Sequence, residues 1–415
     1  MPLFPFWGRV LAGSFRKRAA VAAGSEKRCG APIEPRIPVT DGVIKEGDGP
    51  DVELVNTTPI PASLTLTDIP GREQRFGMII AKATFRIEPT GTALETQDPV
   101  PLFEDDEKTE LGLMPRDNLP RADSAFEVIL LGAARAPDNR LVPAMNVALQ
   151  VGTHRKQLRV FGDRVWQETP PDGHRISVPG PFTRMPLTYE RAFGGCAEVL
   201  LDADSPALVV DPVNPYGRGL NVARKAEQLA EALYTADGYP VYDRARSLPN
   251  VEDPDHLIAD WDDAPPPACW ATVPMSSGYQ AARSVDPDAA SPDAAEDPSV
   301  DFDAPPPTTE HVFHRAHSDW LIPTPQPRTA VVIEGMAPEG ALRFTLPPLR
   351  VFADYAVGDR TGQRELTPQT LVLLPEERRF YIVFRHLFDV TYDPEQNRRM
   401  RLQLDTGALA PASEG

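Results

Sequence analysis

The chain has 415 residues, of which 41% are hydrophobic and 25% charged, and its formal net charge is -18. This composition excludes a wholly disordered chain and a membrane-embedded one. The negative charge argues against nucleic-acid binding, which needs a surface of Lys and Arg to contact phosphates. The length suffices for two domains or one large β domain, because single cores tend to stop growing near roughly 250 to 300 residues.

Residues 1–50 form a basic extension whose apolar start is interrupted by Pro5 and Arg9 and followed by the basic run 16–18. A secretory signal has its basic residues first, so this order predicts no signal peptide. No stretch approaches the ~20 apolar residues that cross a bilayer, and we expect no integral membrane association. We expect a flexible terminus, with weak contact to a membrane surface as the alternative.

The three cysteines, Cys29, Cys196 and Cys269, are odd in number and far apart in the chain. This spacing predicts neither a disulfide framework nor a paired zinc site. It fits a reducing compartment, and we expect a cytoplasmic protein.

From residue 51 onward, short segments rich in β-branched and aromatic residues are bounded by Gly, Pro, Asp or Asn, which is typical of strands. No alternation of strands and helices occurs, so the predicted fold class is mainly β. We expect an antiparallel β-sandwich-like architecture with long loops and one or two short helices, in which 326–405 packs on 51–195. The expected strands are 77–88, 126–134, 145–152, 156–161, 329–336, 341–355, 369–392 and 400–404.

The central region, 196–325, is predicted to be rich in loops. Its exception is a short helix over 221–234, where Asn221 can cap the first turn and Leu229 and Leu233 share one face. The acidic, Pro-rich stretch 281–307 cannot bury enough apolar surface to offset its ordering entropy, so it predicts a flexible loop. Residues 406–415 form a tail.

Two turns are predicted from local sequence. In QLRVFGDRVWQ, Gly162 and Asp163 separate two alternating runs and predict a tight hairpin, because this pair adopts positive φ at little cost. In LVLLPEERRFYIVF, a short polar turn that opens with Pro375 predicts a second hairpin.

Two clusters of aromatic residues, arginine and glycine, FGDRVW (161–166) and MPLTYERAFGG (185–195), are followed by the Pro/Gly turn NPYGRG (214–219). Aromatic and Arg side chains dominate interface hot spots, so one interpretation is a partner-binding surface. We favour a structural role instead, in which Glu190 and Arg191 are partly buried and hydrogen-bonded while the aromatic rings pack in the core. These motif residues are Phe161, Gly162, Asp163, Arg164, Trp166, Phe182, Met185, Pro186, Leu187, Tyr189, Glu190, Arg191, Phe193, Gly194, Gly195, Asn214, Pro215, Gly217 and Gly219.

Familiar catalytic motifs are absent from the sequence, which contains no Walker A loop, GxGxxG turn, GxSxG elbow, HExxH helix or CxxC pair. The alternative to a binding protein is a β-sandwich hydrolase or carbohydrate-active enzyme that uses Asp163, Glu190 or the histidines. In HVFHRAH, His311, His314 and His317 are weak metal candidates, because a spacing of three gathers three ligands neither on a helix nor on a strand. We expect no cofactor.

Several segments together resemble a bacterial domain-of-unknown-function family, whose members act as effector-loading adaptors or chaperones of type VI secretion. The segments are FGDRVW, PFTRMPLTYERAFGG, NPYGRG, LPNVEDP, GMAPEGALRFTLP and TLVLLPEERRFYIVFRH, in that order. The resemblance runs from about Val52 to about Tyr392. It implies a non-catalytic cytoplasmic protein with protein partners: a secreted toxin effector, a PAAR-like protein and a VgrG spike.

Overall fold

The computed structural model describes residues 52–68, 75–89, 91–120, 125–169, 173–202, 205–211, 213–220, 247–274, 314–357, 360–389 and 398–407. All of these residues belong to one compact unit. They form a mainly β structure of several sheets without a closed barrel, which confirms the predicted class. The extension 1–50, the expected helix 221–234, the expected loop 281–307 and the tail beyond 407 lie outside the described residues.

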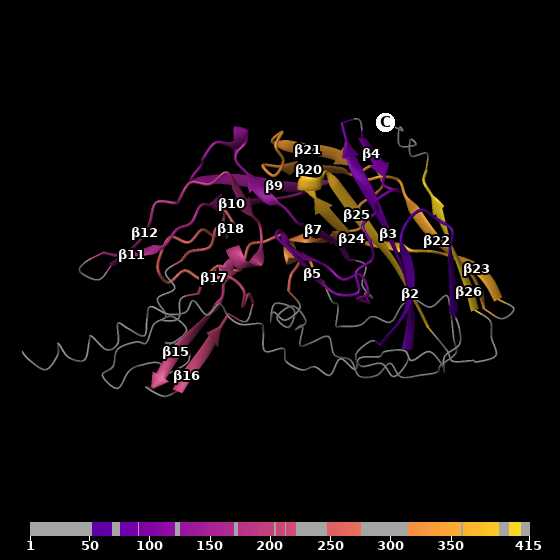
Figure 1. Cartoon of the computed structure of the whole chain (residues 1–415), viewed down its shortest axis with the longest axis horizontal. Coiled ribbons are helices and arrows are strands. Elements are labelled where there is room, and N and C mark those ends of the chain that lie inside the picture. The colour runs from indigo at the N-terminus through magenta and orange to yellow at the C-terminus, as the bar shows by residue number, and fades with distance from the viewer. Residues whose placement is uncertain are drawn as a thin grey trace, which may run out of the picture. The chain divides into compact units, whose positions relative to one another are not determined.

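The largest sheet has seven strands in the order β19-β7-β24-β25-β3-β2, with β4 paired to β3 at one end (Figure 1). Its central strands read as near-continuous apolar runs because both of their faces are covered. In β24, for example, every residue from Gln369 to Leu374 is buried. The bounds are β2 Ala62–Asp68, β3 Arg75–Glu88, β4 Gly91–Leu94, β7 Ala125–Leu130, β19 Leu321–Pro323, β24 Thr367–Leu374 and β25 Arg379–Asp389.

Strands from the N-terminal and C-terminal parts of the chain are neighbours in this sheet. β24 pairs with β7 in parallel, and β25 pairs with β3 over eleven residues from Arg379 to Asp389. The segments 51–195 and 326–405 therefore share one sheet. The predicted hairpin between β24 and β25 is confirmed: Pro375 opens the turn, and Arg378 closes it with a φ of 52°.

A five-stranded sheet has the order β18-β10-β9-β20-β21, and a four-stranded sheet has the order β1-β26-β22-β23. In β10 and β21, buried residues alternate with more exposed ones, as in a sheet with one face in solvent. The bounds are β1 Val52–Asn56, β9 Ala144–Val151, β10 His154–Phe161, β18 Val251–Glu252, β20 Ala330–Glu334, β21 Ala341–Thr345, β22 Arg350–Val357, β23 Arg360–Glu365 and β26 Arg398–Asp405.

Short two-stranded ribbons and the turns between them carry the motif region. The pairs are β5 (Glu107–Thr109) with β6 (Gly112–Met114), β8 (Ala133–Arg135) with β13 (Arg184–Pro186), β11 (Trp166–Thr169) with β12 (Gly173–Ile176), β14 (Phe193–Gly194) with β17 (Arg218–Gly219), and β15 (Cys196–Asp202) with β16 (Ser205–Val210). The 3-10 turns are Pro137–Asn139, Tyr189–Arg191, Ser318–Trp320 and Pro375–Glu377. No helix in the described part of the chain reaches seven residues.

An aromatic stack joins the seven-stranded and five-stranded sheets. The ring of Phe380 on β25 stacks on Phe85 of β3 at 5.1 Å and on Phe344 of β21 at 4.8 Å. All three rings are buried in one continuous core, which extends through both sheets. Packing between the two inner faces accounts for the sandwich-like arrangement.

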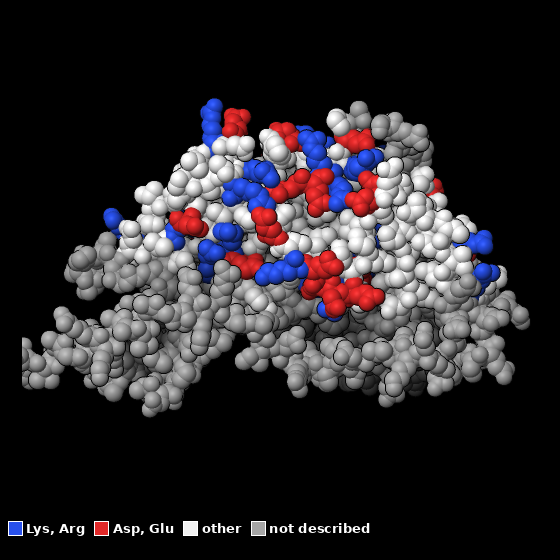
Figure 2. Space-filling view, in the orientation of Figure 1, with Lys and Arg blue, Asp and Glu red and all other residues white. Residues whose placement is uncertain are grey.

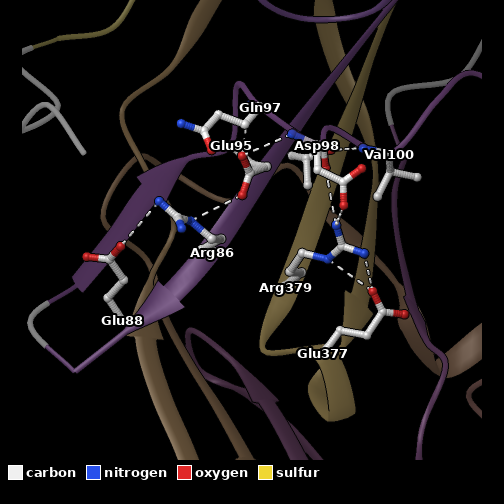
Figure 3. Close-up of polar contacts among 9 residues, drawn as sticks. Arg86, Glu88, Glu95, Gln97, Asp98, Val100, Glu377 and Arg379 are labelled. Carbon is white, nitrogen blue, oxygen red and sulfur yellow. Dashed lines mark hydrogen bonds and ion pairs between the residues drawn. The ribbon is translucent and has the colours of Figure 1, made fainter. Parts of the chain in front are cut away.

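The loop after β4 is fastened to the seven-stranded sheet by charged side chains (Figure 3). Arg86 on β3 pairs with Glu95 at 3.2 Å, and Glu95 accepts backbone N–H groups of Gln97 and Asp98. Arg379 on β25 reaches the Asp98 carboxylate at 3.3 Å. These contacts hold the chain as it leaves β4 and crosses toward β25.

The hairpin predicted at Gly162 and Asp163 is wrong. β10 pairs with β9 and β18, whereas β11 pairs with β12. The chain diverges because the Gly162 N–H donates to Pro143 O and the Gly180 N–H donates to Asp163 O. A Cβ on Gly162 would lie 1.6 Å from Gly180 O, so the glycine serves a close crossing of two chain segments rather than a tight turn.

Among the described residues, no helix combines the length and the apolar character needed to cross a membrane.

Candidate functional site

The arginine of FGDRVW forms a buried ion pair. Arg164 is only 5% exposed and pairs with Glu252 of β18. Its Nη2 also donates to Pro249 O at 2.9 Å, and its guanidinium lies 3.7 Å from the centre of the Phe161 ring. Glu252 accepts the Ile258 N–H at 2.9 Å. Burial lowers the pKa of Arg164 and raises that of Glu252, and their attraction opposes both shifts, so each charge depends on the other.

Asn250 connects the two motif clusters. Its Nδ2 donates to Phe161 O at 3.2 Å and to the Asp163 carboxylate at 3.0 Å. Its Oδ1 accepts from Arg191 Nη1 at 3.1 Å, and its backbone N–H donates to Arg191 O at 2.8 Å. FGDRVW and MPLTYERAFGG therefore meet at the segment LPNVEDP, which binds both. Neither Asn250 nor Glu252 was predicted as a site residue, although LPNVEDP is one of the segments that carry the family resemblance.

The turn NPYGRG closes on the second cluster through a buried asparagine. Asn214 Nδ2 donates to the carbonyl oxygens of Tyr189 (2.8 Å) and Phe193 (2.9 Å). Asn214 O in turn accepts the Gly195 N–H at 2.7 Å. Pro215 and Gly217 lie in the turn, and Gly219 ends β17, which pairs with β14 in parallel. These contacts make the cluster a rigid corner, because the side-chain amide of Asn214 bonds to the carbonyl oxygens of both Tyr189 and Phe193.

We expect Gly194→Ala to destabilise this corner more than a matched glycine replacement. Gly194 has a φ of +133°, and an added Cβ would lie 2.2 Å from Asn214 O, which hydrogen bonds hold in place. Gly91 has a φ of +150° with nothing within 4 Å of an added Cβ, so Gly91→Ala tests backbone strain alone. Gly194→Ala should cost at least about 1 kcal/mol more than Gly91→Ala in urea unfolding. Equal costs would show that the corner yields to the extra atom.

Most apolar side chains of the motifs lie in the protein interior. Trp166 packs edge-on against Trp261, with ring centres 5.4 Å apart, in a small cluster that includes Phe193. Pro186 and Phe161 are half-buried. The other large apolar side chains of the motifs that are buried are Phe182, Met185, Leu187 and Tyr189, which belong to the main core.

The expectation that Glu190 is partly buried is wrong. Glu190 occupies the middle of the 3-10 turn Tyr189–Arg191 and is exposed, because the turn directs Tyr189 inward and its neighbour outward. Asp163 is also exposed, at 80% of its side chain, although it is held by Asn250 and lies 3.9 Å from Arg218. Arg191 is half-buried and hydrogen-bonded to Asn250 and to Met185 Sδ, as the structural interpretation predicted. The motifs therefore combine an internal scaffold with two exposed carboxylates.

Residues 72–385 match the model of a family described as an uncharacterized protein conserved in bacteria, DUF2169. The chain belongs to this family. The matched range contains FGDRVW, MPLTYERAFGG and NPYGRG, so the hydrogen bonds that join these motifs lie within the family domain. No curated protein and no solved structure matches the chain.

The two described histidines of HVFHRAH have separate partners. His314 Nδ1 lies 3.4 Å from the buried Glu127 carboxylate, whereas His317 Nδ1 accepts the Asp319 N–H at 3.2 Å. His311 lies outside the described residues. Within the described ranges, no three His, Cys, Asp or Glu side chains are grouped as metal ligands would be.

A cleft with a volume of about 380 Å³ lies beside β10, β18 and the segment 266–270. Its lining includes His317, Asp253 and Asp319, together with residues 155–158. No residue of the three motifs lines it. The exposed carboxylates of Asp163 and Glu190 therefore do not converge on this cleft, as the catalytic carboxylates of a hydrolase would.

Lys82, in the middle of β3, was not noticed in the sequence. It is fully buried, pairs with Asp117 at 2.6 Å and donates to Pro101 O at 2.7 Å, between the rings of Phe103 and Tyr381. Burial, only partly offset by Asp117, lowers the Lys82 pKa to about 8. The only signal is a single Lys in the apolar run GMIIAKATF, which does not distinguish an inward from an outward side chain.

Charges of both signs are mixed on the described surface in Figure 2, where Lys and Arg side chains lie beside Asp and Glu. Arg155 pairs with Glu334 at 2.8 Å, and Arg116 pairs with Asp105 at 2.9 Å. Such exposed pairs contribute little to stability. Each of them places opposite charges side by side.

Proposed function

We propose that this protein is a non-catalytic adaptor or chaperone that binds a type VI secretion effector and helps to load it onto a PAAR-like protein and VgrG spike in the bacterial cytoplasm. The proposal is supported first by the resemblance of the ordered motifs to effector-loading adaptors. A structural observation also supports it: the motif side chains Arg164 and Arg191 bind groups within the protein, Arg164 to Glu252 and Arg191 to Asn250. A scaffold for presenting a binding surface needs such internal ties, whereas a reactive centre needs polar groups that face a cavity.

Co-purification with the proteins encoded next to it tests this proposal. A tagged copy is expected to bring down a toxin or a PAAR-like protein, and deletion of its gene is expected to abolish export of that toxin. An unrelated effector exported by the same apparatus serves as the control, because its export should continue. If neither partner co-purifies and export is intact, the adaptor function is wrong.

A further inference from the structure

Part of one edge of β10 has no strand beside it. β9 pairs with all eight residues of β10, from His154 to Phe161. On the other side, β18 pairs only with Arg159 and Val160. The stretch 154–158 is therefore a strand with one neighbour among the described residues, and open strand edges are templates for pairing with another chain.

The reason that β18 stops is local. Arg159 lies opposite Glu252, so continuing the antiparallel register would place Pro254 opposite Gln157. Proline has no N–H to donate and cannot extend the ladder. Since the Phe161 N–H donates to Asn250 O on this side, the period of two directs the backbone groups of Gln157 and Arg155 to the same edge. No described backbone group bonds to them there.

This open edge forms one wall of the cleft of about 380 Å³. Residues 155–158 line it on one side, and Pro266, Pro267 and Trp270 line it elsewhere. The two prolines offer no N–H groups that would compete for the carbonyls of β10. At about 3.3 Å per residue, the open stretch extends roughly 17 Å, enough for five residues of an added strand.

The charges around the cleft favour a basic occupant. Both cations of the open stretch have partners within the protein, because Arg155 pairs with Glu334 at 2.8 Å and Lys156 with Asp319 at 3.3 Å. At the β18 end, Asp253 and the exposed Asp255 line the cleft, and the described cationic side chains form no ion pair with Asp255. The net charge of -18 adds a general attraction for a basic partner.

We propose that an extended segment of the cargo protein adds as a strand to β10 beside Arg155 and Gln157, with a Lys or Arg of that segment next to Asp255. Main-chain hydrogen bonds provide the affinity, and the acidic end of the cleft selects the segment. This inference rests on the proposed adaptor function and names its binding site.

Peptides can test the binding mode directly. Overlapping 12-residue peptides that tile the co-purifying toxin are titrated into the full-length protein by calorimetry. One basic segment is expected to bind, and N-methylation of its amides should weaken binding at every second position, because alternate N–H groups of an added strand face its neighbour. Loss at consecutive positions, or no effect of N-methylation, would overturn strand addition.

Matched variants of the protein locate the edge. Gln157→Pro removes an N–H that does not bond to β9, and its control Gln157→Ala retains that N–H. Asp255→Lys reverses a charge inside the cleft, and its control Glu104→Lys makes the same reversal at an exposed position outside the cleft. We expect Gln157→Pro and Asp255→Lys each to weaken toxin binding about tenfold, with both controls unchanged. Asp255→Lys keeps the test decisive if Gln157→Pro impairs folding.

The outcomes separate the two proposals. If wild type binds the toxin and both cleft variants bind it equally well, the edge site is wrong and the adaptor function stands. If wild type binds neither the toxin nor any peptide, both fail. If Gln157→Pro instead converts a dimer into a monomer, a second copy of this chain occupies the edge and the proposal is overturned.

Discussion

Arg164→Ala is expected to lower the free energy of unfolding by about 3 to 5 kcal/mol, because it leaves the carboxylate of Glu252 buried without its cation. Glu252 is 2% exposed and would retain only the N–H of Ile258 as a hydrogen-bond donor. Urea unfolding followed by fluorescence measures the change. Glu190→Ala is the control, since that exposed side chain should change stability by no more than about 0.5 kcal/mol.

The double variant Arg164→Met/Glu252→Gln separates the cost of an unpaired charge from the cost of lost side-chain packing. Glutamine keeps an acceptor for the Ile258 N–H, and methionine keeps much of the volume beside Phe161. It should therefore recover a large part of the loss. A double variant as unstable as Arg164→Ala would mean that packing, rather than the unpaired carboxylate, sets the cost.

Lys82→Met is the second change with a large expected effect, again about 3 to 5 kcal/mol, because Asp117 is buried and would lose its charge partner. Adding Asp117→Asn should restore much of this stability, since asparagine can still accept the Phe103 N–H that Asp117 Oδ2 binds at 2.7 Å. Thermal and urea unfolding of both variants measure the difference. Equal losses in the single and double variants would contradict the ion-pair explanation.

The pH dependence of the same pair has a defined sign. Burial lowers the Lys82 pKa from 10.5 to about 8, although the negative charge of Asp117 opposes this shift. Between pH 8 and pH 10.5, Lys82 is therefore protonated in the unfolded chain and largely neutral in the folded protein. The cost of a buried charge at Lys82 is therefore fully present below pH 8 and disappears as the pH rises to about 10.5. Over that window, wild type should gain up to about 3 kcal/mol relative to Lys82→Met/Asp117→Asn. A constant difference would indicate that Lys82 has an ordinary pKa.

Local sequence patterns predicted those strands and turns whose conformation is determined by residues close by in the chain. LVLLPEERRFYIVF forms a hairpin because Pro375 and Arg378 complete its turn within the segment. QLRVFGDRVWQ does not, because partners far along the chain determine its path: Gly180 crosses Gly162, and Glu252 binds Arg164. The order of strands in the large sheet was likewise beyond local patterns, since β7 and β24 are separated by more than half of the chain.

The motif residues were identified from sequence, but their roles depend on contacts that residue type does not encode. Glu190 and Glu252 are the same residue type, yet one is exposed and the other binds a buried arginine. The sequence also does not predict the open edge of β10. That edge depends on the register between β10 and β18, which places Pro254 opposite Gln157, nearly a hundred residues away in the chain. Pairing between distant segments decides both features.

The most direct test compares stability and toxin binding in Arg164→Met/Glu252→Gln, which changes the centre of the FGDRVW motif but not the cleft. If the motif only stabilises the fold, the double variant should bind the toxin with the Kd of wild type, provided that the purified variant unfolds cooperatively. A double variant as stable as wild type that no longer binds the toxin would place these side chains at the interface and contradict the account.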